Sequence, residues 1–426
     1  MTFQAIKMSR QASILCMCFR LFNTFLHGTT AAMPGMKSRC AGRFLLLTTL
    51  SSFACLGSIR ASPQASRAAS VPSATEDRVK SPGWWPTQGR AAANEYVGVD
   101  ACGGCHRSIF ATQQNTPMAR AAAQAVDAEV LKDHRCLSFR SPGYSYEIAS
   151  TQNGIFYSVS DGTSSVSKPL TWAFGMGVVG QTYIFEKQGA FYESRVSYYH
   201  ATQGLDLTLG HRAPLPNQLE NAPGRAISAT EARLCFGCHM TASTTGNQFD
   251  LKHAYPGVGC EACHGPGAGH VAAMREGHLD QGKKLVMNPA RLNPIDSVDF
   301  CGACHRTAWD VRLGGMTGVV TVRFQPYRLE KSRCWGKGDG RLTCITCHDP
   351  HLPLAQEAAS YDQRCLSCHP SKPGIKTSKD HPGAACPVGN TSCVSCHMLK
   401  VELPGFHAKF TDHWIRITKP GEPFPD

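Results

Sequence analysis

The stretch Cys260-Glu-Ala-Cys263-His264-Gly-Pro-Gly-Ala-Gly-His270 contains the pattern that decides the fold of this chain: two cysteines three residues apart, with a histidine directly after the second. This C-x-x-C-H pattern occurs seven times in 426 residues, and six of the copies fall between Cys235 and His397. The seven copies use fourteen of the 21 cysteines. A disulfide scaffold would not impose one repeated spacing on its cysteines, so the spacing argues against that class.

The spacing is typical of covalent haem attachment. Residues three and four apart lie on one face of a helical turn, so both thiols can reach one edge of a haem. The following histidine can then bind the iron, and C-x-x-C-H is the attachment signature of c-type haem. Zinc ribbons pair their C-x-x-C elements and need no histidine after each one. A thioredoxin-like motif would occur once, near a βαβ pattern.

We therefore expect seven covalently attached haem c groups. The predicted attachment cysteines are Cys102, Cys105, Cys235, Cys238, Cys260, Cys263, Cys301, Cys304, Cys344, Cys347, Cys365, Cys368, Cys393 and Cys396. The predicted proximal iron ligands are His106, His239, His264, His305, His348, His369 and His397.

Ten other histidines outside the N-terminal leader are candidates for the opposite, distal side of an iron. They are His134, His200, His211, His253, His270, His278, His351, His381, His407 and His413. His270 and His351 lie too close to their own motifs to reach the far side of the same haem, so each is expected to serve a neighbouring one. His407 and His413 follow the last motif and can close back on earlier ones. Any single candidate could equally be a surface histidine.

The first motif has no histidine after it until His134. Met118, twelve residues beyond His106, is a candidate distal ligand for this haem, and a thioether ligand would raise its reduction potential. The alternative is an ordinary packing methionine. Three cysteines outside both the leader and the motifs remain, and we expect Cys334 to pair with Cys386 and Cys136 to stay free.

The N-terminal region predicts a signal peptide. The apolar run at 44–57 follows three basic residues and precedes small ones. The run is too short for a confident membrane span. We expect a leader over 1–61, with Met33 or Met36 as the real start of the protein. We also expect export to the periplasm or the cell exterior. An uncleaved N-terminal anchor is the alternative, and it would be the only membrane attachment.

The net charge argues against nucleic acid as a partner. The whole chain carries 43 basic and 31 acidic residues, but residues 1–61 hold seven basic and no acidic ones. The remaining 36 basic and 31 acidic residues give a net charge of only +5. The expected partners are instead redox proteins, either other cytochromes or a quinol-oxidising membrane complex.

The segment between the first motif and Cys235 has a different pattern. Apolar and polar residues alternate at 144–148, 155–159 and 183–185, and the pairs Asn153-Gly154, Asp161-Gly162 and Gln188-Gly189 punctuate them. Such alternation with turn residues predicts strands and hairpins. We therefore expect a small β-rich insertion, which could cover the haems, dock a partner or shape a substrate pocket.

The rest of the chain predicts a mainly α and irregular multihaem cytochrome c fold, in which short helices and loops wrap a haem-packed core. The expected organisation is a leader (1–61), a flexible linker (62–95), a first haem-binding segment (96–140), the β-rich insertion (141–225) and a six-haem cytochrome domain (226–426).

The chain resembles multihaem c-type cytochromes with doubled C-x-x-C-H motifs, a group akin to tetrahaem cytochrome c and the octahaem hydroxylamine oxidoreductase superfamily. The stretches that carry the resemblance are YVGVDACGGCHRSIF (96–110), CEACHGPGAGH (260–270), CHDPH (347–351) and CVSCHM (393–398). It spans residues 96–416. The family often places a distal histidine shortly after the first motif, where this chain has Met118. Ammonia-forming nitrite reductases of the superfamily often carry C-x-x-C-K at the catalytic haem, whereas all seven motifs here end in histidine.

Three functions follow as hypotheses. The first is an exported heptahaem cytochrome, mostly with two histidines per iron, that transfers electrons through its haems. The second is an oxidoreductase acting on a small nitrogen or sulfur compound at one open haem, for which no catalytic residue is identified. The third is a subunit of an extracellular conducting assembly.

Overall fold

The computed structural model describes residues 91–211, 215–246, 248–336, 342–370, 384–419 and 421–425. The predicted leader and nearly all of the predicted linker lie outside these residues, as does His381. All described residues fall within one compact unit. No helix among them is long and apolar enough to span a membrane.

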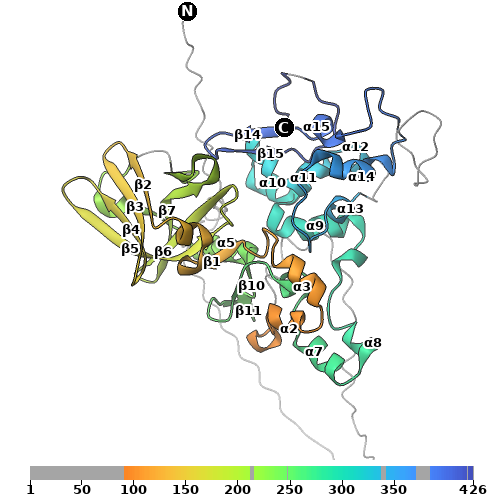
Figure 1. The fold of residues 1–426 in the computed structure, drawn as a ribbon, viewed down its shortest axis with the longest axis horizontal. Coiled ribbons are helices and arrows are strands. Elements are labelled where there is room, and N and C mark those ends of the chain that lie inside the picture. The colour runs from red at the N-terminus through yellow and green to blue at the C-terminus, as the bar shows by residue number, and fades with distance from the viewer. Residues whose placement is uncertain are drawn as a thin grey trace, which may run out of the picture. The chain divides into compact units, whose positions relative to one another are not determined.

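A nine-stranded antiparallel sheet forms between the first and second motifs (orange to green in Figure 1). Seven strands follow one another as a meander from β2 to β8, while β1 pairs with β5 and β9 with β7. The sheet curls into a nearly closed, barrel-like form. Its strands are β1 (Ala122–Gln124), β2 (Cys136–Ser141), β3 (Tyr144–Thr151), β4 (Gly154–Ser160), β5 (Ser165–Phe174), β6 (Gly180–Lys187), β7 (Ala190–Tyr199), β8 (Gly204–Leu207) and β9 (Gly224–Ala226).

The three predicted turns are confirmed, because they join β3 to β4, β4 to β5 and β6 to β7 as antiparallel hairpins. Gly154 and Gly162 have φ angles of 122° and 94°, which glycine adopts at little cost. Successive side chains of a strand point to opposite faces. Tyr183 and Phe185 accordingly pack into the core of the curled sheet, whereas Ile184 between them belongs to a second core on the outside.

The prediction of a mainly α fold with a small β insertion is wrong. Of the described residues, 36% lie in helices and 24% in strands. A haem motif needs only about one helical turn, so seven motifs contribute little helix. The alternating segment, in contrast, forms a continuous sheet, and that sheet also recruits β1 and β2 from residues before 141.

The helices are short, and most motifs lie on one. They are α2 (Val99–Gly103), α3 (Arg107–Gln113), α4 (Glu129–Asp133), α5 (Ala229–His239), α6 (Cys260–His264), α7 (Ala268–Arg275), α8 (Leu279–Gly282), α9 (Pro294–His305), α10 (Ala308–Gly314), α11 (Gln325–Glu330), α12 (Arg333–Gly336), α13 (Cys344–Cys347), α14 (Asp362–Leu366) and α15 (Cys393–His397). Two-stranded ladders join β10 (Met240–Thr241) to β13 (Tyr255–Pro256), β11 (Thr244–Thr245) to β12 (Gln248–Phe249) and β14 (Lys400–Leu403) to β15 (Ala408–Thr411).

Helix α5 attaches the second motif to the outside of the sheet. Ser228 caps its N-terminus by accepting a hydrogen bond from the Glu231 amide at 3.1 Å. Phe236, between the two motif cysteines, is fully buried, and its ring centre lies 4.9 Å from that of Phe174 on β5. The sheet therefore forms an apolar wall beside one of the predicted haem sites.

Candidate haem sites

We number the C-x-x-C-H motifs 1 to 7 in chain order. Each motif makes a single helical turn. In motif 1 the amide of His106 donates to the carbonyl of Cys102 at 2.9 Å, and His348 and Cys344 of motif 5 do the same at 2.9 Å. This hydrogen bond brings the first cysteine and the histidine to one side of the turn. The local geometry is therefore suited to two thioether bonds and one iron ligand.

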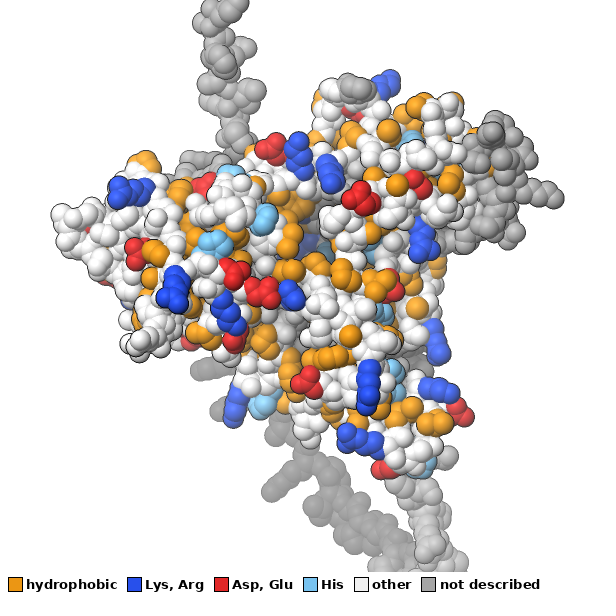
Figure 2. Space-filling view, in the orientation of Figure 1, with side chains coloured by type: hydrophobic (Ala, Val, Ile, Leu, Met, Phe, Trp, Pro, Cys, Tyr) orange, Lys and Arg blue, Asp and Glu red, His pale blue; other side chains and the backbone are white. Residues whose placement is uncertain are grey.

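All seven motif histidines line one continuous cavity of about 3330 Å³, together with every motif cysteine except Cys396. Pockets for one small ligand have volumes of about 300–1,000 Å³, so this cavity has room for several macrocycles. Apolar residues such as Phe174 and Phe324 also line it. Figure 2 shows hydrophobic side chains and histidines intermingled over the middle of one face. Thiols, imidazoles and an apolar lining together fit haem c.

Backbone carbonyls orient four of the motif histidines. The Nδ1 atoms of His239, His264, His369 and His397 donate to carbonyl oxygens at 2.7–3.0 Å. This bond holds the proton on Nδ1 and leaves the Nε2 lone pair for a metal. Burial lowers the pKa of His239 and of His264, which favours the neutral form that binds metals.

Three motif histidines face a second imidazole. The ring centres of His106 and His270 are 6.3 Å apart, those of His264 and His351 are 6.1 Å apart, and those of His348 and His413 are 6.3 Å apart. A metal between two imidazoles lies about 2 Å from each nitrogen, and each nitrogen is roughly 1 Å from its ring centre, so the expected separation is about 6 Å. All three pairs have room for one iron between the rings.

The opposing histidines are oriented like the motif histidines. The Nδ1 of His270 donates to the Gly282 carbonyl at 2.9 Å, and that of His413 donates to the Thr411 carbonyl at 3.0 Å. The Nδ1 of His351 lies 3.2 Å from a carboxylate oxygen of Asp349. In each case Nε2 is left available for a metal.

Met118 and His407, two further distal candidates, are placed differently. His270, rather than the thioether of Met118, lies opposite His106, while Met118 lines the same cavity. His407 is not among the cavity-lining residues, because its Nε2 binds the Asp206 carboxylate at 2.7 Å. Asp206 lies on β8, far from His407 in the chain, and the sequence contains no signal for this contact.

The three cysteines outside the motifs and the leader form no disulfide among the described residues. The expected disulfide between Cys334 and Cys386 is not formed, and Cys136 is free as expected. Cys334 and Cys386 instead belong to the cavity wall.

Thiols from different motifs meet in pairs. The thiol atoms stand here for the thioether sulfurs that attached haem would carry. In four pairs one thiol shifts the pKa of the other, which makes neighbours of motifs 1 and 3, motifs 2 and 4, motifs 4 and 5, and motifs 6 and 7. The pairs are Cys102–Cys260, Cys238–Cys304, Cys301–Cys344 and Cys365–Cys393. Each pair marks a place where the edges of two haem sites adjoin.

Glu261 connects motif 1 to motif 3 through the backbone. Its buried carboxylate accepts hydrogen bonds from the amides of Val97 at 3.0 Å, Gly98 at 2.8 Å and Gly267 at 2.7 Å. The sequence analysis missed this residue. A carboxylate inside the C-x-x-C gap, unique to motif 3 among the seven, was the available signal.

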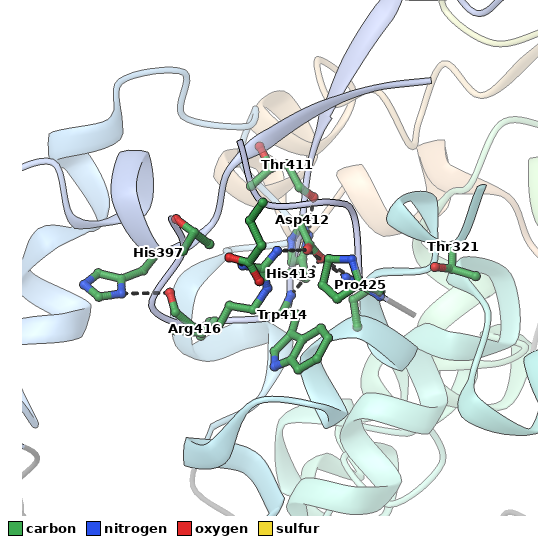
Figure 3. A network of polar contacts seen from close by, with 12 residues as sticks. Thr321, His397, Thr411, Asp412, His413, Trp414, Arg416 and Pro425 are labelled. Atoms are coloured by element: carbon green, nitrogen blue, oxygen red, sulfur yellow. Dashed lines mark hydrogen bonds and ion pairs between the residues drawn. The ribbon is translucent and has the colours of Figure 1, made fainter. Parts of the chain in front are cut away.

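A second missed group holds the C-terminal segment (Figure 3). The fully buried guanidinium of Arg328 donates to both oxygens of Asp412 at 2.8 Å. Asp412 directly precedes His413, and the carbonyl of Arg416 accepts from Nδ1 of His397 at 3.0 Å. One buried ion pair thus fixes a segment that contacts two motif histidines, His348 through His413 and His397 through Arg416.

Comparisons with known proteins agree with this site. The family model described as cytochrome c554 and c-prime matches residues 208–265, which contain motifs 2 and 3. The chain is 24% identical over 183 residues to the multiheme cytochrome MtrA of Shewanella baltica, a match that covers 39% of this chain and 52% of the relative. These matches and the seven motifs support a multihaem c-type cytochrome.

The chain spans about half the length of this curated relative. Among solved structures it matches that of the outer cell wall cytochrome OcwA, with a TM-score of 0.43, 15% identity and coverage of 76% of this chain and 80% of the other. These matches and the motifs together imply covalently bound haem c.

Proposed function

We propose that this cytochrome is an exported heptahaem electron-transfer protein, in which His270, His351 and His413 complete the iron coordination of motifs 1, 3 and 5. The observation that carries the proposal is the set of three imidazole pairs at 6.1–6.3 Å, each spaced for one iron. When bound, haem c supplies reversible one-electron chemistry at iron. Ligation by protein on both sides favours electron transfer over substrate binding, because no coordination position stays open.

The contacts between motifs support a connected path. The histidines that follow motifs 3 and 5 face the motif histidines of motifs 1 and 3, respectively. The thiol pairs independently join motif 1 to 3, 2 to 4 and 4 to 5. Burial, and then the charge of Cys347, raises the pKa of the Cys365 thiol, and the second cause indicates that motifs 5 and 6 are neighbours. Motif 5 is then a junction from which arms lead to motifs 3 and 1, to motifs 4 and 2, and to motifs 6 and 7.

Export is supported by the predicted signal peptide. Periplasmic or extracellular redox proteins are the proposed partners, in line with the sequence prediction. Cell fractionation with N-terminal sequencing of the mature protein tests this part. A full-length chain retained in the cytoplasm without haem would contradict it.

The decisive test is EPR and optical spectroscopy of the purified holoprotein, with the haem number taken from its intact mass. We expect seven haems, low-spin signals from motifs 1, 3 and 5, and reversible reduction of all of them. A high-spin iron that binds nitrite, hydroxylamine or cyanide and turns one of them over would replace electron transfer by the oxidoreductase function. Filaments that form on concentration would favour the conducting assembly.

A further inference from the structure

Arg323 is a half-buried arginine on the wall of the haem cavity. It is the last residue of the 3-10 helix η7 (Val319–Arg323), and it lines the cavity together with His239 and His305. Its guanidinium carbon lies 4.5 Å from the ring centre of Phe406 and 5.5 Å from that of Phe410. Two aromatic faces therefore hold the cation in place.

No carboxylate among the described residues lies within ion-pair distance of Arg323. Arg328 differs sharply, because Asp412 binds its guanidinium at 2.8 Å. Burial, together with the nearby charge of Arg306, lowers the pKa of Arg323 to about 10. The guanidinium stays charged at neutral pH, so its positive charge is fixed inside the cavity and no described acidic residue neutralises it.

Arg323 lies between motifs 2 and 4. Burial is the main cause that lowers the pKa of His239 and of His305, and the charge of Arg323 lowers both further, which places it near both imidazoles. Motifs 2 and 4 themselves adjoin, because the Cys238 thiol lies 3.8 Å from the Ala303 carbonyl oxygen. The thiols Cys238 and Cys304 of these two motifs also meet. The sheet and α5 exclude water beside motif 2 with an apolar cluster that includes Phe174 and Phe236. A charge in such a low-dielectric place acts more strongly than one at the surface.

We propose that Arg323 raises the reduction potentials of the haems attached at motifs 2 and 4 and so makes this arm the high-potential end of the path. A fixed positive charge disfavours ferric iron relative to ferrous iron, because ferric iron carries one more positive charge. The inference rests on the proposed haem occupancy of motifs 2 and 4. It assigns Arg323 a role in setting the direction of electron flow, with no contact to iron.

The propionates of the haems are the carboxylates left to meet this guanidinium, since arginine binds carboxylates well. Removing the cation would leave such a propionate without its counter-charge, and an uncompensated negative charge also favours ferric iron. Both effects lower the potentials when Arg323 is neutralised, so the predicted sign does not depend on how a propionate is oriented.

The test is a spectroelectrochemical redox titration of the purified holoprotein carrying Arg323→Gln. We expect the reduction potentials of two one-electron components to fall. At a given applied potential their ratio of reduced to oxidised iron should drop about tenfold, which corresponds to a fall of about 59 mV in reduction potential. Arg323→Lys keeps the charge and should stay close to the parent. Arg140→Gln removes an exposed arginine on β2, outside the cavity wall, and should shift nothing.

Titrations of Arg323→Gln and the parent that superimpose would overturn the inference, as would an equal fall of every component or a fall in Arg323→Lys as large as in Arg323→Gln. If Arg323→Gln does not assemble, Arg323→Met provides a second neutral side chain that can pack on the Phe406 ring. Intact mass separates the two proposals. Seven haems with unchanged potentials contradict only the role of Arg323, whereas fewer than seven haems contradict the proposed function.

Discussion

The imidazole of His351 lies parallel to that of His264, with ring centres 6.1 Å apart and planes 11° apart. His351 follows motif 5 by three residues, yet it faces the histidine of motif 3. The contact thus joins two haem sites directly, through one histidine from each stretch of chain. It also means that the loss of one side chain should change the iron of a different motif from the one it follows.

The variant His351→Ala should lose the second imidazole at motif 3. We expect one haem to change from low spin to high spin, because the remaining axial ligand is His264 alone, while the haem number stays the same. EPR and optical spectra of the holoprotein measure the change. His253→Ala is the control, since His253 is exposed and contacts Asp250 on the surface. An unchanged low-spin spectrum in His351→Ala would contradict the assignment.

A second comparison decides which residue serves the iron of motif 1. His270→Ala should generate one high-spin haem, whereas Met118→Leu should leave all spin states and potentials as in the parent, because His270 faces His106. The volume of Met118 is nearly kept in leucine, so packing is preserved. If Met118→Leu produced the high-spin signal and His270→Ala did not, thioether ligation at motif 1 would be correct.

The variant Asp412→Ala should strongly destabilise the holoprotein. Arg328 is fully buried and would keep an unpaired charge, and breaking a buried ion pair costs about 3–5 kcal/mol of unfolding free energy. Denaturant titration followed by far-UV circular dichroism measures the loss. Asp280→Ala is the matched control, because its partner Lys283 is exposed and such pairs contribute about 0–1 kcal/mol. Equal losses in both variants would show that the buried pair has no special role.

Glu330 predicts a pH dependence of stability. Burial, and then the charge of Asp299, raises the pKa of Glu330 from 4.5 to about 7. Between these values the folded protein holds a proton that the unfolded chain has lost, so stability falls as the pH rises from about 4.5 to 7 and then levels off. Glu330→Gln should remove this slope. Its free energy of unfolding should therefore rise relative to that of the parent by roughly 3 kcal/mol as the pH goes from 4.5 to 7.

The measurement is the free energy of unfolding of both proteins at pH 5, 6, 7 and 8. Glu402→Gln is the control, because it removes an exposed carboxylate on β14. Parallel curves for Glu330→Gln and the parent would mean that Glu330 ionises normally in the folded protein.

Part of the site was predictable from the chain because it is local. The hydrogen bond from His106 to Cys102 closes within five residues, and each of the other motifs repeats this spacing in its own sequence. The hairpin turns at Gly154 and Gly162 were predictable for the same reason, since turn residues act over two to four positions. The extent of the sheet was not, because whether β1 and β2 join it depends on pairing with strands elsewhere in the chain.

The sequence by itself determined the chemistry of attachment: which thiols and which imidazoles can bind haem, because one helical turn places them together wherever the chain goes. Only the tertiary structure decided which sites are neighbours. It placed His413 opposite His348, moved His407 to Asp206, and left Arg323 between motifs 2 and 4. These relationships join residues far apart in the chain, and they depend on burial and packing, which no local spacing encodes.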